Sequence, residues 1–241
     1  MKLYPTSKQS AYIDRYTQDV IGIPGIVLME KAADAAVRAF IEKFPSFDRK
    51  DKILVVAESG NNGGDGAATA RILKLLGYDV DILFVKGLKK STDSFDLQMS
   101  VAKKCGVGIL EMTDEVVKDI LSSDRYKIVF DAIFGVGLRR EVTGKQKQAV
   151  DMINSLSAYK IAIDIPTGIS ADTGKVLGCA VKCDMTVTFS FIKYGMTLND
   201  AGSFCGEILC PQIDLIAPPD KEFTDAFRDS EDPLDRELHY M

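Results

Sequence analysis

The stretch KILVVAESGNNGGDGAATARILKLLGYDVDILFV, residues 52–85, decides the fold class. Within it, residues 53–57 form a short continuous apolar run, which is typical of a strand covered on both faces. A loop rich in Gly and Asn and a helical stretch to Leu76 follow, with Gly77 placed to cap the helix. Residues 80–85 are then predicted to form the next strand. This order predicts one strand–helix–strand unit of a parallel sheet.

The same alternation continues along the chain. Upstream, residues 7–44 have helical spacing interrupted at 22–25, and beyond Pro218 the chain is charged and proline-punctuated. We therefore expect a doubly wound, mostly parallel sheet with helices on both faces and helices at the N-terminus, formed by residues 1–217, followed by a loosely held charged tail, 218–241. Further strands are predicted at 107–110, 128–130, 160–164, 185–189 and 208–210, and further helices at 94–104, 114–121 and 145–156.

Composition excludes several classes of protein. The 241 residues are 46% hydrophobic and 27% charged, the usual mix for a soluble globular protein. The net charge is −5, and the densest basic cluster, Lys86, Lys89 and Lys90, is interpreted as a solvated loop, so no nucleic-acid partner is expected. No apolar run approaches the roughly 18 residues that cross a bilayer, and the polar first 17 residues predict no signal peptide.

Cysteine and histidine usage limits the chemistry. The five cysteines form an odd set without CxxC spacing, which favours reduced thiols and a cytoplasmic location. The only histidine, His239, lies near the end of the chain, so a mechanism of the Ser-His-Asp or Cys-His type would have to recruit the tail. Acid–base chemistry is therefore expected from carboxylates, lysines or bound water.

Three polar loops follow predicted strands, and ligands of open α/β sheets bind outside the carboxyl ends of the strands. The first is GNNGGDG, residues 60–66, whose four glycines let backbone approach a ligand and permit positive φ. It opens onto an expected helix from Ala67, whose N-terminus favours an anion such as a phosphate. The alternative is a tight turn capped by Asp65. The stretch fits neither GxGxxG nor the Walker A pattern.

The second loop, residues 131–141, begins with Asp131, and the third is Asp164-Ile165-Pro166-Thr167-Gly168. A carboxylate held by a stiff proline turn is suited to acid–base catalysis, although Asp164 could instead only close the turn. Lys193 lies beyond a later strand, and taken alone a lysine in this position is more often a surface residue. Asp131, Asp164, Asn62 and Thr167 offer hard oxygen atoms, which fit either a cation or a hydrogen-bonded cluster.

With these motifs in this order, the chain resembles the YjeF N-terminal domain family, the NAD(P)H-hydrate epimerases, from about Lys8 to Asp214. The resemblance is carried by Gly-Ile-Pro at 22–24 followed by Leu-Met-Glu at 28–30, by GNNGGDG at 60–66, by Asp131-x-x-Phe134-Gly135-x-Gly137, by residues 164–168, and by Thr188-Phe189 before Lys193-Tyr194-Gly195. The resemblance implies a Rossmann-like three-layer α/β/α sandwich, usually dimeric.

The implied activity is interconversion of the R and S epimers of NADHX and NADPHX, hydrated cofactors that carry a hydroxyl at C6 of the nicotinamide ring. A separate dehydratase acts on the S form, and one potassium ion is expected per subunit. Asp164 is the expected general acid/base, assisted by Lys193. The resemblance assigns potassium to Asn62, Asp131 and Thr167. It assigns substrate contacts to Asn61, Asn62, Gly63, Gly64, Asp65, Gly135, Val136, Gly137, Leu138, Arg139, Arg140, Glu141 and Asp164.

Two positions depart from the family pattern. Glu58-Ser59 stands where Gly-Pro is common, and an acid there could repel a phosphate; Thr167 stands where Ser is usual and keeps its hydroxyl oxygen. The alternatives are a non-catalytic scaffold domain, as in enhancer-of-decapping proteins, or another nucleotide-binding enzyme on this fold. A homodimer is expected through the N-terminal helices, unless their alanine face covers the domain's own sheet; that face comprises Ala32, Ala35, Ala36 and Ala39.

Overall fold

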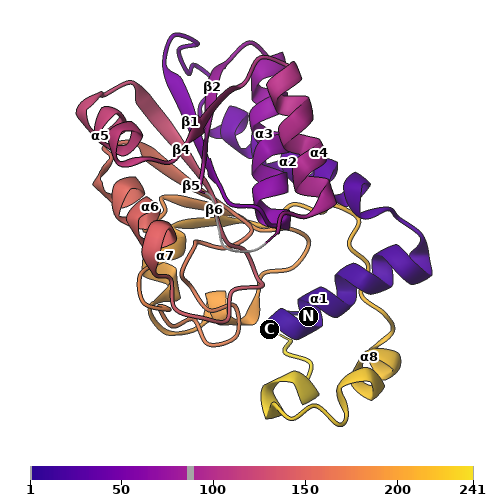
Figure 1. Ribbon diagram of the computed structural model, residues 1–241. Coiled ribbons are helices and arrows are strands. Elements are labelled where there is room, and N and C mark those ends of the chain that lie inside the picture. Colours follow the sequence, from indigo (N-terminus) through magenta and orange to yellow (C-terminus); the bar gives the residue numbers. More distant parts are fainter. Residues whose placement is uncertain (1, 86–89, 241) are drawn as a thin grey trace.

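The computed structural model describes residues 2–85 and 90–240, so Lys86 and Lys89 of the expected basic loop lie outside the described residues. The described chain forms helices on both sides of a central sheet (Figure 1). The strands are β1 (Lys52–Ala57), β2 (Asp79–Phe84), β3 (Gly108–Glu111), β4 (Tyr126–Ala132), β5 (Tyr159–Ile163), β6 (Met185–Val187) and β7 (Glu207–Leu209). The helices are α1 (Ser7–Tyr16), α2 (Gly25–Lys43), α3 (Asn61–Leu75), α4 (Asp93–Lys104), α5 (Asp114–Ser122), α6 (Gly144–Ser155), α7 (Gly202–Cys205) and α8 (Asp220–Phe227), with a π-helical turn at Thr17–Ile21.

The strands are arranged in the order β3-β2-β1-β4-β5-β6-β7, and every pair is parallel. The chain builds outward from β1 in one direction and then, beginning with β4, in the other. The switch point between β1 and β4 is where open sheets of this kind bind ligands. The predicted doubly wound α/β fold is therefore confirmed.

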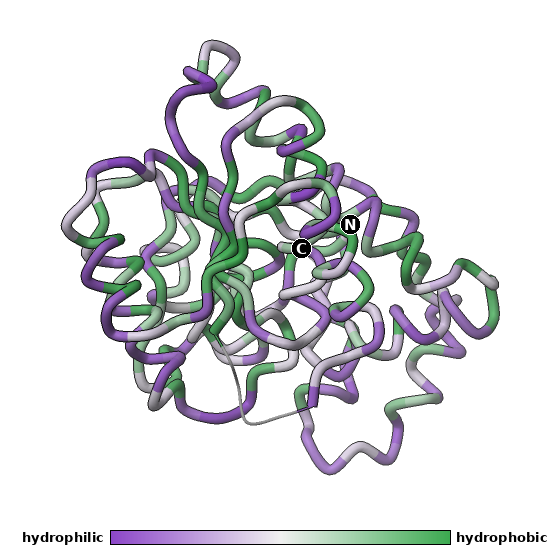
Figure 2. Tube along the Cα trace, turned by 45° about the horizontal axis from the view of Figure 1, so that its top comes forward, coloured by the Kyte–Doolittle hydropathy of each residue, from purple (hydrophilic) through white to green (hydrophobic). Residues whose placement is uncertain are grey.

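Two apolar cores lie on opposite faces of the sheet. Alternate residues of β1 point to opposite sides, so Val55 joins the core under α2, α3 and α4, while Val56 joins the core under α5 and α6. Strand residues are apolar along most of their length, as Figure 2 shows for the central strands, because both faces are covered by helices. No helix in the described ranges is both long and apolar enough to cross a membrane.

The alanine face of α2 covers the domain's own sheet. Ala32, Ala36 and Ala39 are all buried, and they belong to the same core as strand residues such as Val55. Small side chains there let α2 pack closely on its neighbours within the chain. This alanine face is therefore not a free surface for a second subunit. It gives no support to the expected dimer through the N-terminal helices.

The C-terminal segment is not loosely held, contrary to the expectation from its charge. Its helix α8 packs on α1, where Tyr12 stacks on Phe223 with ring centroids 5.7 Å apart and also meets the edge of Phe227. The backbone N–H of Tyr4 donates to the carbonyl oxygen of His239 at 2.8 Å, which brings the two ends of the chain together (Figure 1). Aromatic residues in an otherwise charged segment were the signal for this packing.

Asp235 fastens this segment to the start of α1. It is 3% exposed, and its carboxylate accepts from Thr6 Oγ1 at 2.7 Å, Lys8 Nζ at 2.7 Å and Ser230 Oγ at 3.1 Å. Burial alone would raise the pKa of Asp235, but these hydrogen bonds outweigh it and hold that pKa below its usual value. The segment therefore depends on an ionised carboxylate.

We predict that Asp235→Ala lowers the free energy of unfolding by about 1–3 kcal/mol, because it removes the acceptor of several buried donors. Asp229→Ala, which removes an exposed charge of the same segment, is the control and should change little. Because the pKa of Asp235 is lowered on folding, its contribution is full above its unfolded pKa of about 3.8 and is lost as pH falls further. Urea unfolding at pH 7 measures the difference. Equal losses of unfolding free energy in the two variants would show that Asp235 does not fasten the C-terminal segment to α1.

Candidate active site

Four neighbouring strands bring the polar motifs to one edge of the sheet. Strands β1, β4, β5 and β6 lie side by side in this order, and all run in the same direction. Their carboxyl ends therefore lead into α3 with Asn62, the loop with Gly135, the turn with Asp164, and the segment with Thr188 and Lys193. The strand order therefore brings these four segments together, which the sequence pattern could only suggest.

The center of this edge is a buried ion pair between Lys193 Nζ and Asp164 Oδ1, whose side chains are 6% and 13% exposed. Lys193 also donates to Thr188 Oγ1 at 2.7 Å. An ion pair that is nearly shielded from water interacts far more strongly than one at the surface, and removing one partner leaves an uncompensated charge. Lys193 is therefore a buried residue at this edge of the sheet, paired with Asp164, and not a surface lysine.

The backbone conformation at Asp164 and its hydrogen bonds fix the orientation of the carboxylate. Asp164 has φ of 71°, a left-handed conformation that Asp tolerates better than most residues. Its own N–H donates to the carbonyl oxygen of Val187 at 2.8 Å, and its Oδ2 accepts from the Val136 N–H at 2.9 Å. One carboxylate oxygen thus faces an ammonium and the other a backbone amide, an arrangement that fixes the orientation of the group.

Asn62 and Gly135 adjoin this carboxylate. A Cβ on Gly135 would lie 2.7 Å from Asp164 Oδ2 and 3.3 Å from Asn62 Oδ1, so glycine is required for the three segments to meet. Asn62 is 9% exposed, and neither its Oδ1 nor its Nδ2 has a hydrogen-bond partner within the described chain. Buried amides are nearly always hydrogen-bonded, so an orphaned one at this position points to a missing ligand.

Asp131 and Thr167 form a second buried cluster one loop away. Thr167 donates to Asp131 from its N–H at 2.8 Å and from its Oγ1 at 2.7 Å, and the Phe134 N–H donates to Thr167 Oγ1 at 3.0 Å. Asp131 is completely buried, and no cationic side chain pairs with it within the described residues. Burial raises the pKa of Asp131 to about 6, although the hydrogen bonds from Thr167 and Ile133 oppose it.

The glycine-rich stretch is helical, which corrects the expectation of a loop before a helix at Ala67. Helix α3 begins at Asn61, with Gly60 as its N-cap, and its glycines have no positive φ. They serve close packing instead: a Cβ on Gly63 would lie 1.7 Å from the Glu58 carbonyl oxygen, and one on Gly66 would lie 2.4 Å from Ala132 Cβ. The helix N-terminus consequently lies directly against the ends of β1 and β4.

Asp65 contributes a second carboxyl group to this region. Burial raises its pKa well above the usual value, the carboxylates of Asp164 and Asp14 raise it further, and Lys193 lowers it. This environment favours the protonated form of Asp65 beside the ionised pair. Asp14 belongs to α1, and no feature of the sequence pointed to its place near the site.

The 131–141 loop divides into two parts. Gly135 and Val136 meet Asp164, as described above. Leu138 belongs to the apolar core under α5 and α6 instead of facing a ligand. Arg139 donates to Ser7 Oγ at 3.3 Å, at the start of α1. The other residues with assigned substrate contacts here are exposed: Gly137, Arg140 and Glu141, together with Asn61 on α3.

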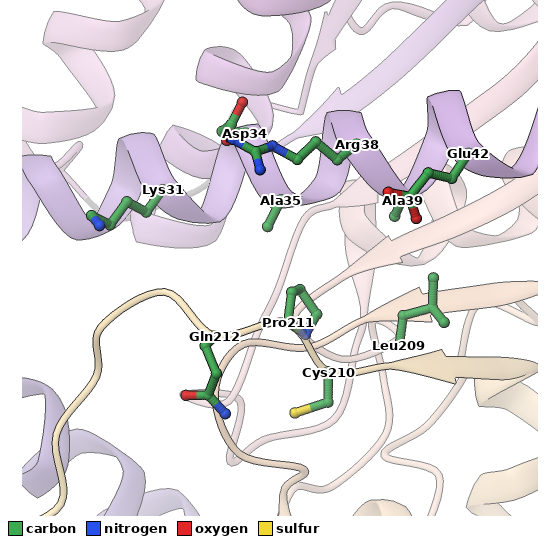
Figure 3. Close-up of a pocket in the computed structure, with 10 residues that line it drawn as sticks. All are labelled: Lys31, Asp34, Ala35, Arg38, Ala39, Glu42, Leu209, Cys210, Pro211 and Gln212. Atoms are coloured by element: carbon green, nitrogen blue, oxygen red, sulfur yellow. The ribbon is translucent and has the colours of Figure 1, made fainter. Parts of the chain in front are cut away.

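A cavity of about 540 Å³ lies away from this edge, between α2 and the chain that follows β7 (Figure 3). Figure 3 shows Lys31, Asp34, Arg38 and Glu42 along the helix above it. Asp34 pairs with Arg38 at 2.7 Å, and Lys31 pairs with Asp214. None of the predicted site residues lines this cavity, so we do not assign the activity to it.

Comparisons with known proteins identify the family. Residues 25–195 match the family described as YjeF-related protein N-terminus. The chain belongs to this YjeF-related family. Two relatives named NAD(P)H-hydrate epimerase come from Oenococcus oeni, 40% identical over 216 residues (90% of this chain and 99% of the relative), and Levilactobacillus brevis, 38% identical over 212 residues (88% and 94%).

The fold of this YjeF-related chain also agrees with an experimental structure. The crystal structure of the yeast protein ynu0 matches with a TM-score of 0.76 at 21% identity, covering 99% of each chain. At this identity the match supports the fold alone. It agrees with the Rossmann-like three-layer sandwich that the resemblance implied.

In the sequence, Thr188 stands out only as part of the family motif, which gives it no role. Its hydroxyl contacts Lys193, and Thr188 lies immediately after β6, next to the end of β5. The only available signal was its position after an apolar strand and five residues before the lysine. The orphaned amide of Asn62 had no sequence signal.

The glycines of α3 provide a test of the packing in this YjeF-related site. Gly63→Ala places a methyl group on the Glu58 carbonyl oxygen, so we expect a loss of about 1–3 kcal/mol in unfolding free energy. Gly60→Ser is the matched control, because no atom lies within 4 Å of its Cβ, its φ is −96°, and serine is a good N-cap. Urea unfolding of both variants checks this; a Gly63→Ala protein as stable as Gly60→Ser would refute it.

Proposed function

We propose that the chain is an NAD(P)H-hydrate epimerase that interconverts the R and S forms of NADHX and NADPHX. The observation that carries the proposal is the buried Asp164–Lys193 pair, set beside the N-terminus of α3 at the carboxyl edge of the sheet. Relatives that align over most of the chain are named for this activity. The site contains both a proton-transfer pair and a place for a phosphorylated substrate.

The chemistry requires a proton and a compensating charge. C6 of the substrate is a hemiaminal carbon, so epimerisation breaks the bond from C6 to the hydroxyl oxygen or to the ring nitrogen and remakes it on the other face. For C–O cleavage, Asp164 is the general acid/base: it passes a proton taken from Lys193 to the departing hydroxyl, which leaves as water, and the carboxylate, ionised again, stabilises the cation left on the ring. Water returns on the opposite face and gives a proton back through Asp164 to Lys193, so no electron is gained or lost.

The start of α3 is proposed to hold the substrate's pyrophosphate. The first N–H groups of a helix lack intrahelical acceptors, and the helix dipole favours an anion there. Glu58, whose charge could have opposed an anion, is 8% exposed and accepts a hydrogen bond from Ser59 Oγ at 3.0 Å. Its carboxylate is therefore buried and hydrogen-bonded, and it is not exposed at the surface.

Potassium is proposed to bind at Asn62, Asp131 and Thr167. A buried carboxylate without a cationic partner and an orphaned amide oxygen fit a cation that prefers oxygen ligands. Within the described ranges, no group of three or more His, Cys, Asp or Glu side chains is placed to hold a metal, which fits a monovalent ion better than zinc. When bound, potassium would supply positive charge that orders the loops.

Three further proposals rest on the family and, for the location, on the cysteines. We propose a homodimer, a functional pairing with a separate NAD(P)HX dehydratase that consumes the S epimer, and a cytoplasmic location. The buried alanine face of α2 gives no support to a dimer through that face. The free cysteines are compatible with a reducing compartment.

The deciding experiment incubates the protein with each separated NADHX epimer and follows interconversion by chromatography. Starting from either pure epimer, the enzyme is expected to produce the same equilibrium mixture of R and S forms. A protein that binds NADHX but leaves both epimers unchanged would instead be a binding domain on the same fold.

We predict that Asp164→Asn lowers kcat by about 10²–10⁴ with KM nearly constant, because it removes a group that acts mainly in the transition state. Asparagine tolerates the positive φ at this position, so the backbone is retained. The variant should also lose stability, since Lys193 keeps its charge but loses its partner. Steady-state kinetics on either epimer gives the result, and an unchanged kcat would remove Asp164 from the chemistry.

For potassium, we predict a higher melting temperature in potassium chloride than in tetramethylammonium chloride at equal ionic strength. At 100 times the dissociation constant, binding stabilises the fold by about 2.7 kcal/mol, and each kcal/mol raises the melting temperature by about 2–4 °C. Asp131→Asn should abolish the difference. Asp172→Asn, which alters a carboxylate bonded to Ser7, should retain it. The same melting temperature in both salts for the wild type would argue against the ion.

A further inference from the structure

The third partner of the buried ion pair is a threonine. Thr188 is completely buried, and its Oγ1 lies 2.7 Å from Lys193 Nζ. An ammonium group only donates hydrogen bonds, so this oxygen must accept. The hydroxyl hydrogen is then free to point at the Phe191 carbonyl oxygen, 3.4 Å away. The bond to Lys193 therefore has a defined direction.

The backbone holds Thr188 in place relative to Asp164. Strands β5 and β6 pair in register from Ile161 with Met185 to Ile163 with Val187, so Asp164 and Thr188 follow the ends of adjacent strands. The Asp164 N–H donates to Val187, and the Thr188 N–H donates to Leu209 at 2.9 Å. Both acceptors of the ammonium are thus fixed by the sheet, while the lysine stem reaches them from the following loop.

We propose that Thr188 is a positioning residue that directs the Lys193 ammonium. Two of the three ammonium N–H groups go to Thr188 and Asp164, which fixes the direction of the third toward the reacting hydroxyl of the substrate. Without the threonine oxygen, the amine rotates about its Cε–Nζ bond and the buried charge loses an acceptor. This inference rests on the proposed epimerase function, which it deepens.

The test uses Thr188→Val, which keeps the shape of the side chain and removes the hydroxyl. We expect kcat to fall by about 10–100-fold, the effect of losing one hydrogen bond to a charged group, with KM changed by less than about threefold. Thr188→Ser, which restores the oxygen, should recover kcat to within about threefold of wild type. If Thr188→Val does not fold, Thr188→Cys takes its place, because a thiol is only a weak acceptor.

The chain offers a matched control in Thr186. It is completely buried two residues earlier, in β6, and its Oγ1 donates to the Cys205 carbonyl oxygen at 2.7 Å. Thr186→Val therefore removes a buried hydroxyl and its hydrogen bond without touching Lys193. Its kcat should stay near that of wild type. An equal fall of kcat in both valine variants, or no fall in Thr188→Val, would overturn the proposal.

A second measurement separates this inference from the proposed function. Trace labelling with acetic anhydride, read by mass spectrometry, compares the reactivity of Lys193 in the wild type and the variants. Losing the Thr188 acceptor frees one N–H group of the amine and loosens its placement, so Lys193 should be labelled faster in Thr188→Val than in Thr186→Val. If wild type fails to interconvert the epimers, the proposed function fails, and the labelling still decides on Thr188: equal rates in the two variants would refute its role.

Discussion

The buried pair of Lys193 and Asp164 is the interaction on which the site depends. Two opposite charges that are 6% and 13% exposed are costly to bury, and they are tolerated because each is held by further hydrogen bonds. Thr188 holds the ammonium and the Val136 N–H holds the carboxylate. A pair fixed in this way is ready to move a proton without rearranging first, which is the condition for efficient acid–base catalysis in a partly dry site.

The parallel sheet makes this pair possible. Because β1, β4, β5 and β6 are neighbours, four segments distant in sequence end at one edge. Glycine lets them approach one another: a side chain on Gly135 would collide with Asp164, and one on Gly66 would collide with Ala132. The N-terminus of α3 is thereby brought next to the ion pair. In the proposed function, an anionic substrate binds at the helix while its ring reaches Asp164 and Lys193, so the same strand order would arrange both binding and chemistry.

Much of the fold could be predicted from the sequence, because apolar runs such as residues 53–57 alternate with amphipathic segments. The placement of Asp164 and Lys193 at one site needed the strand order, which periodicity does not encode. Glycines disfavour helices, so GNNGGDG was predicted to be a loop, whereas tertiary packing makes it the start of α3. The charged composition of the C-terminal segment likewise predicted a loosely held tail, whereas Phe223 and Asp235 fasten this segment to α1. The orphaned amide of Asn62 is a property of three-dimensional packing alone.

The most direct test of the central claim is a double-mutant cycle between Asp164 and Lys193, using Asp164→Asn, Lys193→Met and the double variant. Stability and kcat are measured for all four proteins. If the two groups act as one buried catalytic unit, the double variant should be no slower than Asp164→Asn. It should also be more stable than the sum of the single losses predicts, because removing both charges leaves none unpaired. Additive effects on both kcat and unfolding free energy would show that the two residues act independently and would contradict the account.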